Sequence, residues 1–253
     1  MVDFGNPDEL RRWLPAQPRE LGIALAARSA LRVLPMIGLQ SATVGTGPLL
    51  RSDTFNVQTC FRCLSTAWIA FGPYLGDRRL PIRVRARSAA AVTPQIGTLF
   101  TTPAASAARR SAAEAARFVA STGQSSSESL VNAITAAYLA EPFPDLSKPR
   151  PNACASALAG DLEFVANRDA SLLSDVPLWL NRPPAWAEPR WRDLKIALTN
   201  AQQDWQVWTT WYDDRLDGRV NPIEREVAYV DVPDELWKQD PAVVNKEIIR
   251  RIE

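Results

Sequence analysis

Large apolar side chains recur at helical spacing from Glu188 to Gly218. At about 100° per residue they fall on one stripe, which Trp208 widens on one side. The predicted core positions in this stretch are Trp191, Leu198, Trp205, Trp208, Tyr212 and Leu216. Gly218 follows the last apolar position, where a left-handed C-terminal cap is needed. The pattern predicts one long amphipathic helix. Because each buried aromatic side chain removes roughly 150–250 Å² from water, we expect the other helices to pack on it.

The segment from Pro18 to Leu34 is apolar on nearly every side, which predicts a central helix. Its only charges in mid-helix are Arg28 and Arg32, which are four residues apart and therefore lie on one face. We expect at least one of them to contact a carboxylate from the acidic second half of the chain. Burial of these arginines against an empty concave pocket would instead favour a ligand site.

Helix-start signals and helical spacing recur along most of the remaining chain. Further helices are predicted at roughly 6–14, 53–71, 104–121, 127–140, 152–174 and 240–252. Alternation of apolar and polar residues, the pattern of a half-buried strand, is nearly absent. The sequence therefore predicts an all-α fold, an irregular multi-helix bundle organised around the tryptophan-rich helix. We expect one helical domain over residues 1–253.

Residues 86–140 differ in composition from the rest, since alanine and serine dominate and large side chains are few. We interpret this region as a helical insertion that buries little area per residue, and we expect thin packing or mobility. Residues 142–151 are rich in proline and are predicted to form a connector. A protein-binding role would need an exposed apolar patch, which we expect within 86–140.

Charge is balanced overall but uneven along the chain. Residues 1–140 carry 15 arginines against 8 acidic residues, whereas residues 141–253 carry 14 basic against 20 acidic residues. The simplest interpretation is that the two halves pack against each other. The alternative is a basic face for a polyanion, for which the arginine run at 78–87, including Arg83 and Arg85, is the candidate nucleic-acid or phosphate contact.

The residue types available for catalysis are limited. The chain has no histidine and three cysteines, Cys60, Cys63 and Cys154, so histidine-based chemistry and a four-ligand cysteine zinc site are both excluded. Cys60 and Cys63 form a CxxC on a predicted helix, where buried structural cysteines are the favoured interpretation. Asp213 and Asp214 lie in the densest acidic cluster and could hold a divalent cation, although their positions point away from the aromatic stripe.

Two segments resemble known proteins. Residues 26–35 (AARSALRVLP) and 208–218 (WTTWYDDRLDG), with the tail from Trp237 to Asn245, are similar to helical segments of uncharacterised alphaproteobacterial proteins. The resemblance covers roughly the first and last thirds of the chain. That family has no assigned activity, so the resemblance implies no catalytic residue. Some members of that family are longer, which implies that this region is one module of a larger architecture.

The favoured function is a cytoplasmic, non-enzymatic bacterial module that binds another protein or a larger assembly. The site candidates are Arg28, Arg32, Arg83, Arg85, Asp213 and Asp214. We expect no catalysis, no cofactor and no tightly bound metal, and the sequence shows neither a secretion signal nor a spanning segment. Two alternatives remain open. One is a carboxylate-dependent metal enzyme acting on a phosphorylated or nucleic-acid substrate, and the other is nucleic-acid binding through the arginine run.

Overall fold

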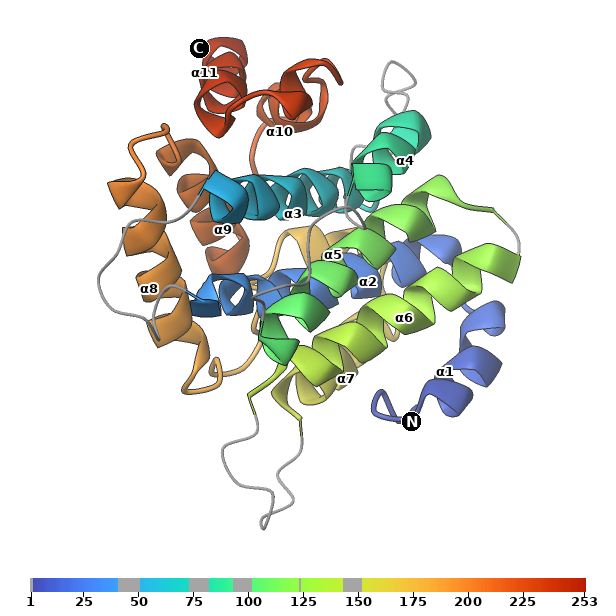
Figure 1. Ribbon diagram of the computed structural model, residues 1–253. Coiled ribbons are helices and arrows are strands. Elements are labelled where there is room, and N and C mark those ends of the chain that lie inside the picture. Colours follow the sequence, from blue (N-terminus) through green and yellow to red (C-terminus); the bar gives the residue numbers. More distant parts are fainter. Residues whose placement is uncertain (1, 41–50, 73–81, 93–101, 123, 143–151) are drawn as a thin grey trace.

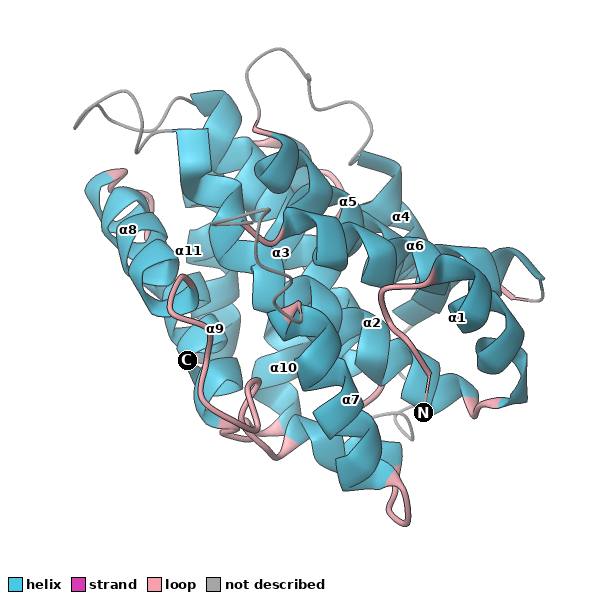
Figure 2. Ribbon diagram, turned by 90° about the horizontal axis from the view of Figure 1, so that it is seen from below, coloured by secondary structure: helices cyan, strands magenta, loops and turns pink. Residues whose placement is uncertain are grey.

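A computed structural model describes residues 2–40, 51–72, 82–92, 102–122, 124–142 and 152–253. Over these residues the protein is all-α, with eleven α-helices and no strand, which confirms the predicted fold class (Figures 1 and 2). The helices are α1 (Pro7–Trp13), α2 (Arg19–Val33), α3 (Arg51–Ile69), α4 (Ile82–Val92), α5 (Pro103–Ala120), α6 (Gln124–Ala140), α7 (Ala153–Val165), α8 (Ala187–Asn200), α9 (Gln206–Asp217), α10 (Ile223–Val230) and α11 (Pro241–Ile252). Within the described ranges, no helix is long and apolar enough to cross a membrane.

Helix α2 is central, as its apolar composition predicts. It contacts α3, α5, α6 and α7, and nearly all its residues from Leu21 to Val33 are buried. Helix α5 lies across it and packs most extensively against α6 (Figure 1). Helices α1 and α5 begin at N-cap residues, Asn6 and Thr102, whose side chains accept backbone N–H groups of the first turn.

The expectation of thin packing in the alanine-rich region is wrong for its described helices. Buried alanines on α5 include Ala105, Ala108, Ala112, Ala115 and Ala116. Because a methyl side chain lets two helix backbones approach closely, α5 and α6 can form the most extensive helix–helix contact in the described chain. Ser111 strengthens the pairing, since its hydroxyl donates to the carbonyl of Ala133 at 2.7 Å across the two helices.

The prediction of one long helix from Glu188 to Gly218 is also wrong. The stretch forms two helices, α8 and α9, separated by a turn in which Gln202 and Asp204 have φ values of 53° and 59°. A helix cannot continue through left-handed backbone, so the stripe is divided. Gly218 has the predicted left-handed conformation, with φ of 70°, and caps α9.

The predicted core positions on both helices face the interior. Trp191, Leu198, Trp205, Trp208 and Tyr212 are buried, and Leu216 is half-buried against the core. Trp208 stacks on Phe61 of α3 with ring centroids 4.9 Å apart, and Tyr212 donates its hydroxyl to the carbonyl of Leu31 on α2 at 3.0 Å. Large aromatic side chains thus join α9 to helices far away in sequence.

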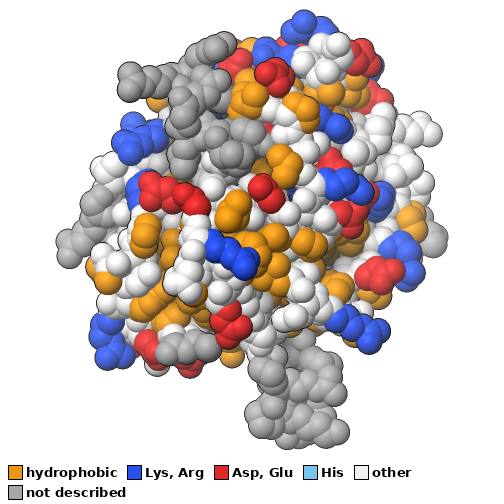
Figure 3. Space-filling view, turned by 180° about the vertical axis from the view of Figure 1, so that it is seen from behind, with side chains coloured by type: hydrophobic (Ala, Val, Ile, Leu, Met, Phe, Trp, Pro, Cys, Tyr) orange, Lys and Arg blue, Asp and Glu red, His pale blue; other side chains and the backbone are white. Residues whose placement is uncertain are grey.

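The segment predicted as one helix over 152–174 divides into α7 and a 3₁₀ turn, Ala170–Ser174. Together with the chain that follows, it lies on the side turned away from the viewer in Figure 1, the side that Figure 3 shows. Two predicted features, the arginines Arg78 and Arg79 and most of the proline-rich connector, lie outside the described residues.

Candidate functional site

Arg28 and Arg32 project from α2 toward α7, where both meet one carboxylate. The Nε of Arg28 lies 3.1 Å from Oδ2 of Asp161, and Nη2 of Arg32 lies 2.7 Å from the same oxygen. None of the three side chains is exposed to solvent. The expected contact between these arginines and the acidic half is therefore confirmed, and it is a buried structural contact between two helices.

Most of the remaining donors of the two arginines are directed at backbone, whereas Nη1 of Arg32 is buried without a hydrogen-bond partner among the described residues. Arg28 donates to the carbonyls of Leu173 and Pro177 at 2.7 Å each, and Arg32 donates to the carbonyl of Leu178 at 2.8 Å. Burial lowers the pKa of Arg28 to about 10, although the charge of Asp161 opposes this shift. Because these carbonyls come from the segment after α7, the arginines hold that segment against α2.

Asp213 and Asp214 are both engaged, and by different partners. Asp213 accepts the indole N–H of Trp191 at 2.8 Å and forms an ion pair with Lys195. Asp214 accepts Nε of Arg219 at 2.8 Å, and its side chain is buried although its helix position points away from the aromatic stripe. Neighbouring residues on a helix point about 100° apart, so the two carboxylates do not converge on one site.

A third acid of the same cluster, Glu226 on α10, is fully enclosed. It accepts Nη1 of Arg215 at 2.8 Å and the indole N–H of Trp211 at 3.1 Å. The guanidinium of Arg215 also lies over the ring of Trp68 at 4.8 Å, so aromatic faces surround the charged pair. Among the described residues, no group of three or more histidine, cysteine or acidic side chains is placed to hold a metal ion.

Arg83 and Arg85 on α4 take different directions. Arg85 pairs with Asp231 at the end of α10, at 2.8 Å, whereas Arg83 is exposed. The arginine run therefore does not present one continuous row of cations over its described part. Arg85 acts as a tie between α4 and the C-terminal helices.

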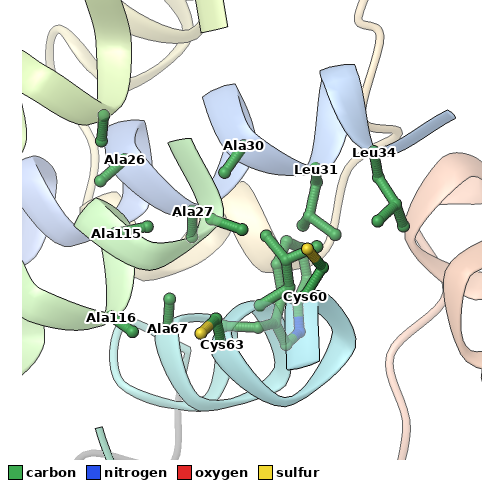
Figure 4. Close-up of a cluster of buried hydrophobic side chains, with 14 of the residues drawn as sticks. Ala26, Ala27, Ala30, Leu31, Leu34, Cys60, Cys63, Ala67, Ala115 and Ala116 are labelled. Carbon is green, nitrogen blue, oxygen red and sulfur yellow. The ribbon is translucent and has the colours of Figure 1, made fainter. Parts of the chain in front are cut away.

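Cys60 and Cys63 lie in the interior between α2, α3 and α5 (Figure 4). Figure 4 shows them among the apolar side chains of Leu31, Ala67 and Ala116. Burial raises the pKa of the Cys60 thiol, which disfavours the reactive thiolate. These buried, apolar surroundings are typical of structural cysteines and not of a redox pair.

Sequence reasoning did not single out Asp161, although it contacts both arginines. The available signal was an acid on the apolar helix that contains Leu158 and Leu162, which requires a buried partner. It also did not single out Arg117, which belongs to no motif, although it lines a hollow with Arg87, the last residue of the arginine run.

Comparison of the chain with models of known protein families, with curated proteins and with solved structures finds no match.

Proposed function

We propose that the protein is a non-enzymatic helical module that binds another protein. The observation that carries this proposal is that the carboxylates of the candidate sites are already paired with basic side chains. The carboxylates nearest to the candidate sites are each paired with a basic side chain: Asp161, Asp213, Asp214 and Glu226. Three of these pairs join different elements of the fold, and the pair of Asp214 with Arg219 lies at the end of α9. A carboxylate held in this way is a poor ligand for a cation and a poor general base, since ligation would break a structural contact.

The surface behind α2 supports a binding role. Hydrophobic side chains gather in the middle of the face seen in Figure 3. The chain from 162 to 186 contributes several large apolar side chains that remain half-buried or exposed: Phe164, Leu172, Val176, Leu180 and Trp186. We call this the 162–186 face. Arg28 and Arg32 of α2 donate to backbone carbonyls in the middle of this face, at Leu173, Pro177 and Leu178. Such restraint of the backbone reduces the entropy lost on binding.

The expected binding patch within 86–140 is not favoured, because the described alanine helices there are packed in the interior. Leu139, which is 56% exposed, is the large apolar side chain that α6 leaves on the surface. A single exposed side chain of this kind is ordinary for a soluble protein and does not define an interface.

The test is quantitative affinity capture from the native host, followed by reconstitution with the purified partner. Leu172, which is 39% exposed, is replaced in Leu172→Glu, and Ile196 on α8, which is 54% exposed, is replaced in the control Ile196→Glu. We expect a stoichiometric partner that Leu172→Glu loses and Ile196→Glu retains. Equal recovery with both variants, or no stoichiometric partner at all, contradicts the proposal.

A further inference from the structure

A hollow of about 580 Å³ opens to solvent between α4, the end of α5 and the beginning of α6. Its polar lining consists of Arg87, Arg117, Ser121, Thr122 and Ser129, and its remaining walls are alanines. Guanidinium groups and hydroxyls are the side chains that recognise phosphate oxygens most readily. The volume is that of an ordinary small-molecule site.

A third arginine, Arg19, binds the carbonyl groups at the C-terminal end of α5, which borders the hollow. Nη2 of Arg19 donates to the carbonyls of Phe118, Val119 and Ser121, at 2.9, 3.2 and 2.9 Å. The last carbonyls of a helix carry partial negative charge, which repels an anion. Because the Arg19 guanidinium satisfies these carbonyls, the end of α5 can border an anion site without that penalty.

Helix α4 adds cations and no acid. Its sequence from Ile82 to Val92 contains Arg83, Arg85 and Arg87 and no aspartate or glutamate. Arg83 and Arg87 are one turn apart and exposed, and neither forms an ion pair within the described ranges. Like charges at this spacing slightly destabilise a helix, and a bound anion would relieve their repulsion.

Geometry and charge connect these arginines in pairs. Arg87 and Arg117 line the same hollow. Burial lowers the pKa of Arg19, and the charge of Arg83 lowers it further. Within the described residues, Glu20 interacts with Arg19, and Glu114 pairs with Arg117. Two interacting carboxylates against four guanidinium groups favour a positive potential in this part of the described structure.

We propose that this hollow binds a compact ligand through a phosphate or pyrophosphate group, held by Arg87 and Arg117 with a hydrogen bond from the hydroxyl of Ser129, since the hydroxyl of Ser121 donates to the carbonyl of Phe118. Arg83 and Arg19 supply long-range attraction. A nucleic-acid strand is the weaker candidate, because Arg85, which would extend the cationic surface along α4, is turned to Asp231. The site uses α4, α5 and α6 and does not rest on the proposed 162–186 face.

The test is isothermal titration of the full chain with inorganic pyrophosphate at low ionic strength, where screening is weak. We expect saturable one-to-one binding. Arg87→Gln should weaken it by about tenfold, equivalent to about 1.4 kcal/mol, and Arg83→Gln by a smaller factor. The control is Arg192→Gln, an exposed arginine on α8 whose loss changes the net charge equally and should leave the affinity within about twofold.

Two further ligands distinguish the source of the phosphate. A phosphoserine peptide that binds as tightly as pyrophosphate assigns the phosphate to a protein, whereas weaker peptide binding assigns it to a free metabolite. Absence of saturable pyrophosphate binding overturns the proposal, as does an equal effect of Arg87→Gln and Arg192→Gln. Affinity for single-stranded RNA that rises with length and exceeds that for pyrophosphate overturns the assignment to a compact ligand.

Discussion

Arg28 on α2 and Asp161 on α7 form an ion pair from which solvent is excluded, with Nε 3.1 Å from Oδ2. Arg32 shares the carboxylate, so one anion serves two buried cations. Removing the charge of Asp161 leaves both guanidinium groups without a counter-ion in the interior. We therefore expect Asp161→Asn to lower the free energy of unfolding by about 3–5 kcal/mol, measured by urea denaturation.

The control for Asp161→Asn lies on the same helix. Glu163 is exposed, and Glu163→Gln should change the free energy of unfolding by less than about 0.5 kcal/mol. If Asp161→Asn costs no more than this control, the buried ion pair does not hold α2 against α7.

Gly218 is the position where backbone conformation and packing both require glycine. Its φ is 70°, and a Cβ there would lie 2.5 Å from the backbone nitrogen of Pro177. Gly218→Ala should therefore destabilise the protein by about 2 kcal/mol or more, because the left-handed conformation alone costs an alanine about 1–2 kcal/mol.

A second glycine supplies the comparison for thermal unfolding of Gly218→Ala. Gly160 lies inside α7, and an added Cβ would lie 3.9 Å from the nearest atom, in Leu180. Gly160→Ala should raise stability by about 0.5–1 kcal/mol, since alanine favours the helix interior. Equal effects of the two substitutions would show that the backbone at Gly218 is not constrained.

Trp205 tests the aromatic core. Its side chain is almost completely buried beside Phe61, with ring centroids 6.4 Å apart. Trp205→Ala should lower the free energy of unfolding by about 3–5 kcal/mol, which is the usual cost of a large cavity. Ile196→Ala, on the exposed face of α8, should cost less than about 0.5 kcal/mol. A loss below about 1 kcal/mol for Trp205→Ala would contradict its assignment to the core.

Glu247 on α11 supplies a prediction on pH. Hydrogen bonds from Arg250 and then Arg251 lower its pKa to about 2, from an ordinary value of 4.5. Because the folded-state pKa is depressed, the stabilisation is fully present above pH 4.5 and is lost as the pH falls toward 2. Carboxyl-carbon NMR should report the depressed pKa in the native protein and a clearly higher one in Arg250→Gln. An unchanged pKa in that variant would contradict the role of Arg250.

The all-α class and most helix positions follow from local patterns, because spacing and caps act over a few residues. Gly218 was identified as a cap because it follows the last apolar position of a periodic stretch. The break before α9 is not predicted by the sequence pattern, because Gln202 and Asp204 are not strong helix breakers. Aspartate adopts left-handed backbone more readily than most residues, but this is a weak signal in one sequence.

Local sequence patterns do not determine the contacts of the candidate sites. The expected pairing of Arg28 and Arg32 with an acid was correct, but Asp161 is separated from them by more than a hundred residues, and no local pattern encodes that choice. The alanine-rich helices were misjudged for another physical reason. Area per residue underestimates their packing, because small side chains allow the backbones themselves to come into contact.

The central claim is that Asp213 and Asp214 are structural and do not bind a metal ion, since Asp213 joins α9 to α8 and Asp214 pairs with Arg219 at the end of α9. Titration calorimetry with Mg²⁺, Mn²⁺ and Zn²⁺ tests it on the native chain and on the variant carrying both Asp213→Asn and Asp214→Asn. We predict no saturable metal binding to the native chain and a loss of stability in the variant in the absence of any metal. Stoichiometric, micromolar metal binding by the native chain that disappears in the variant would contradict the account.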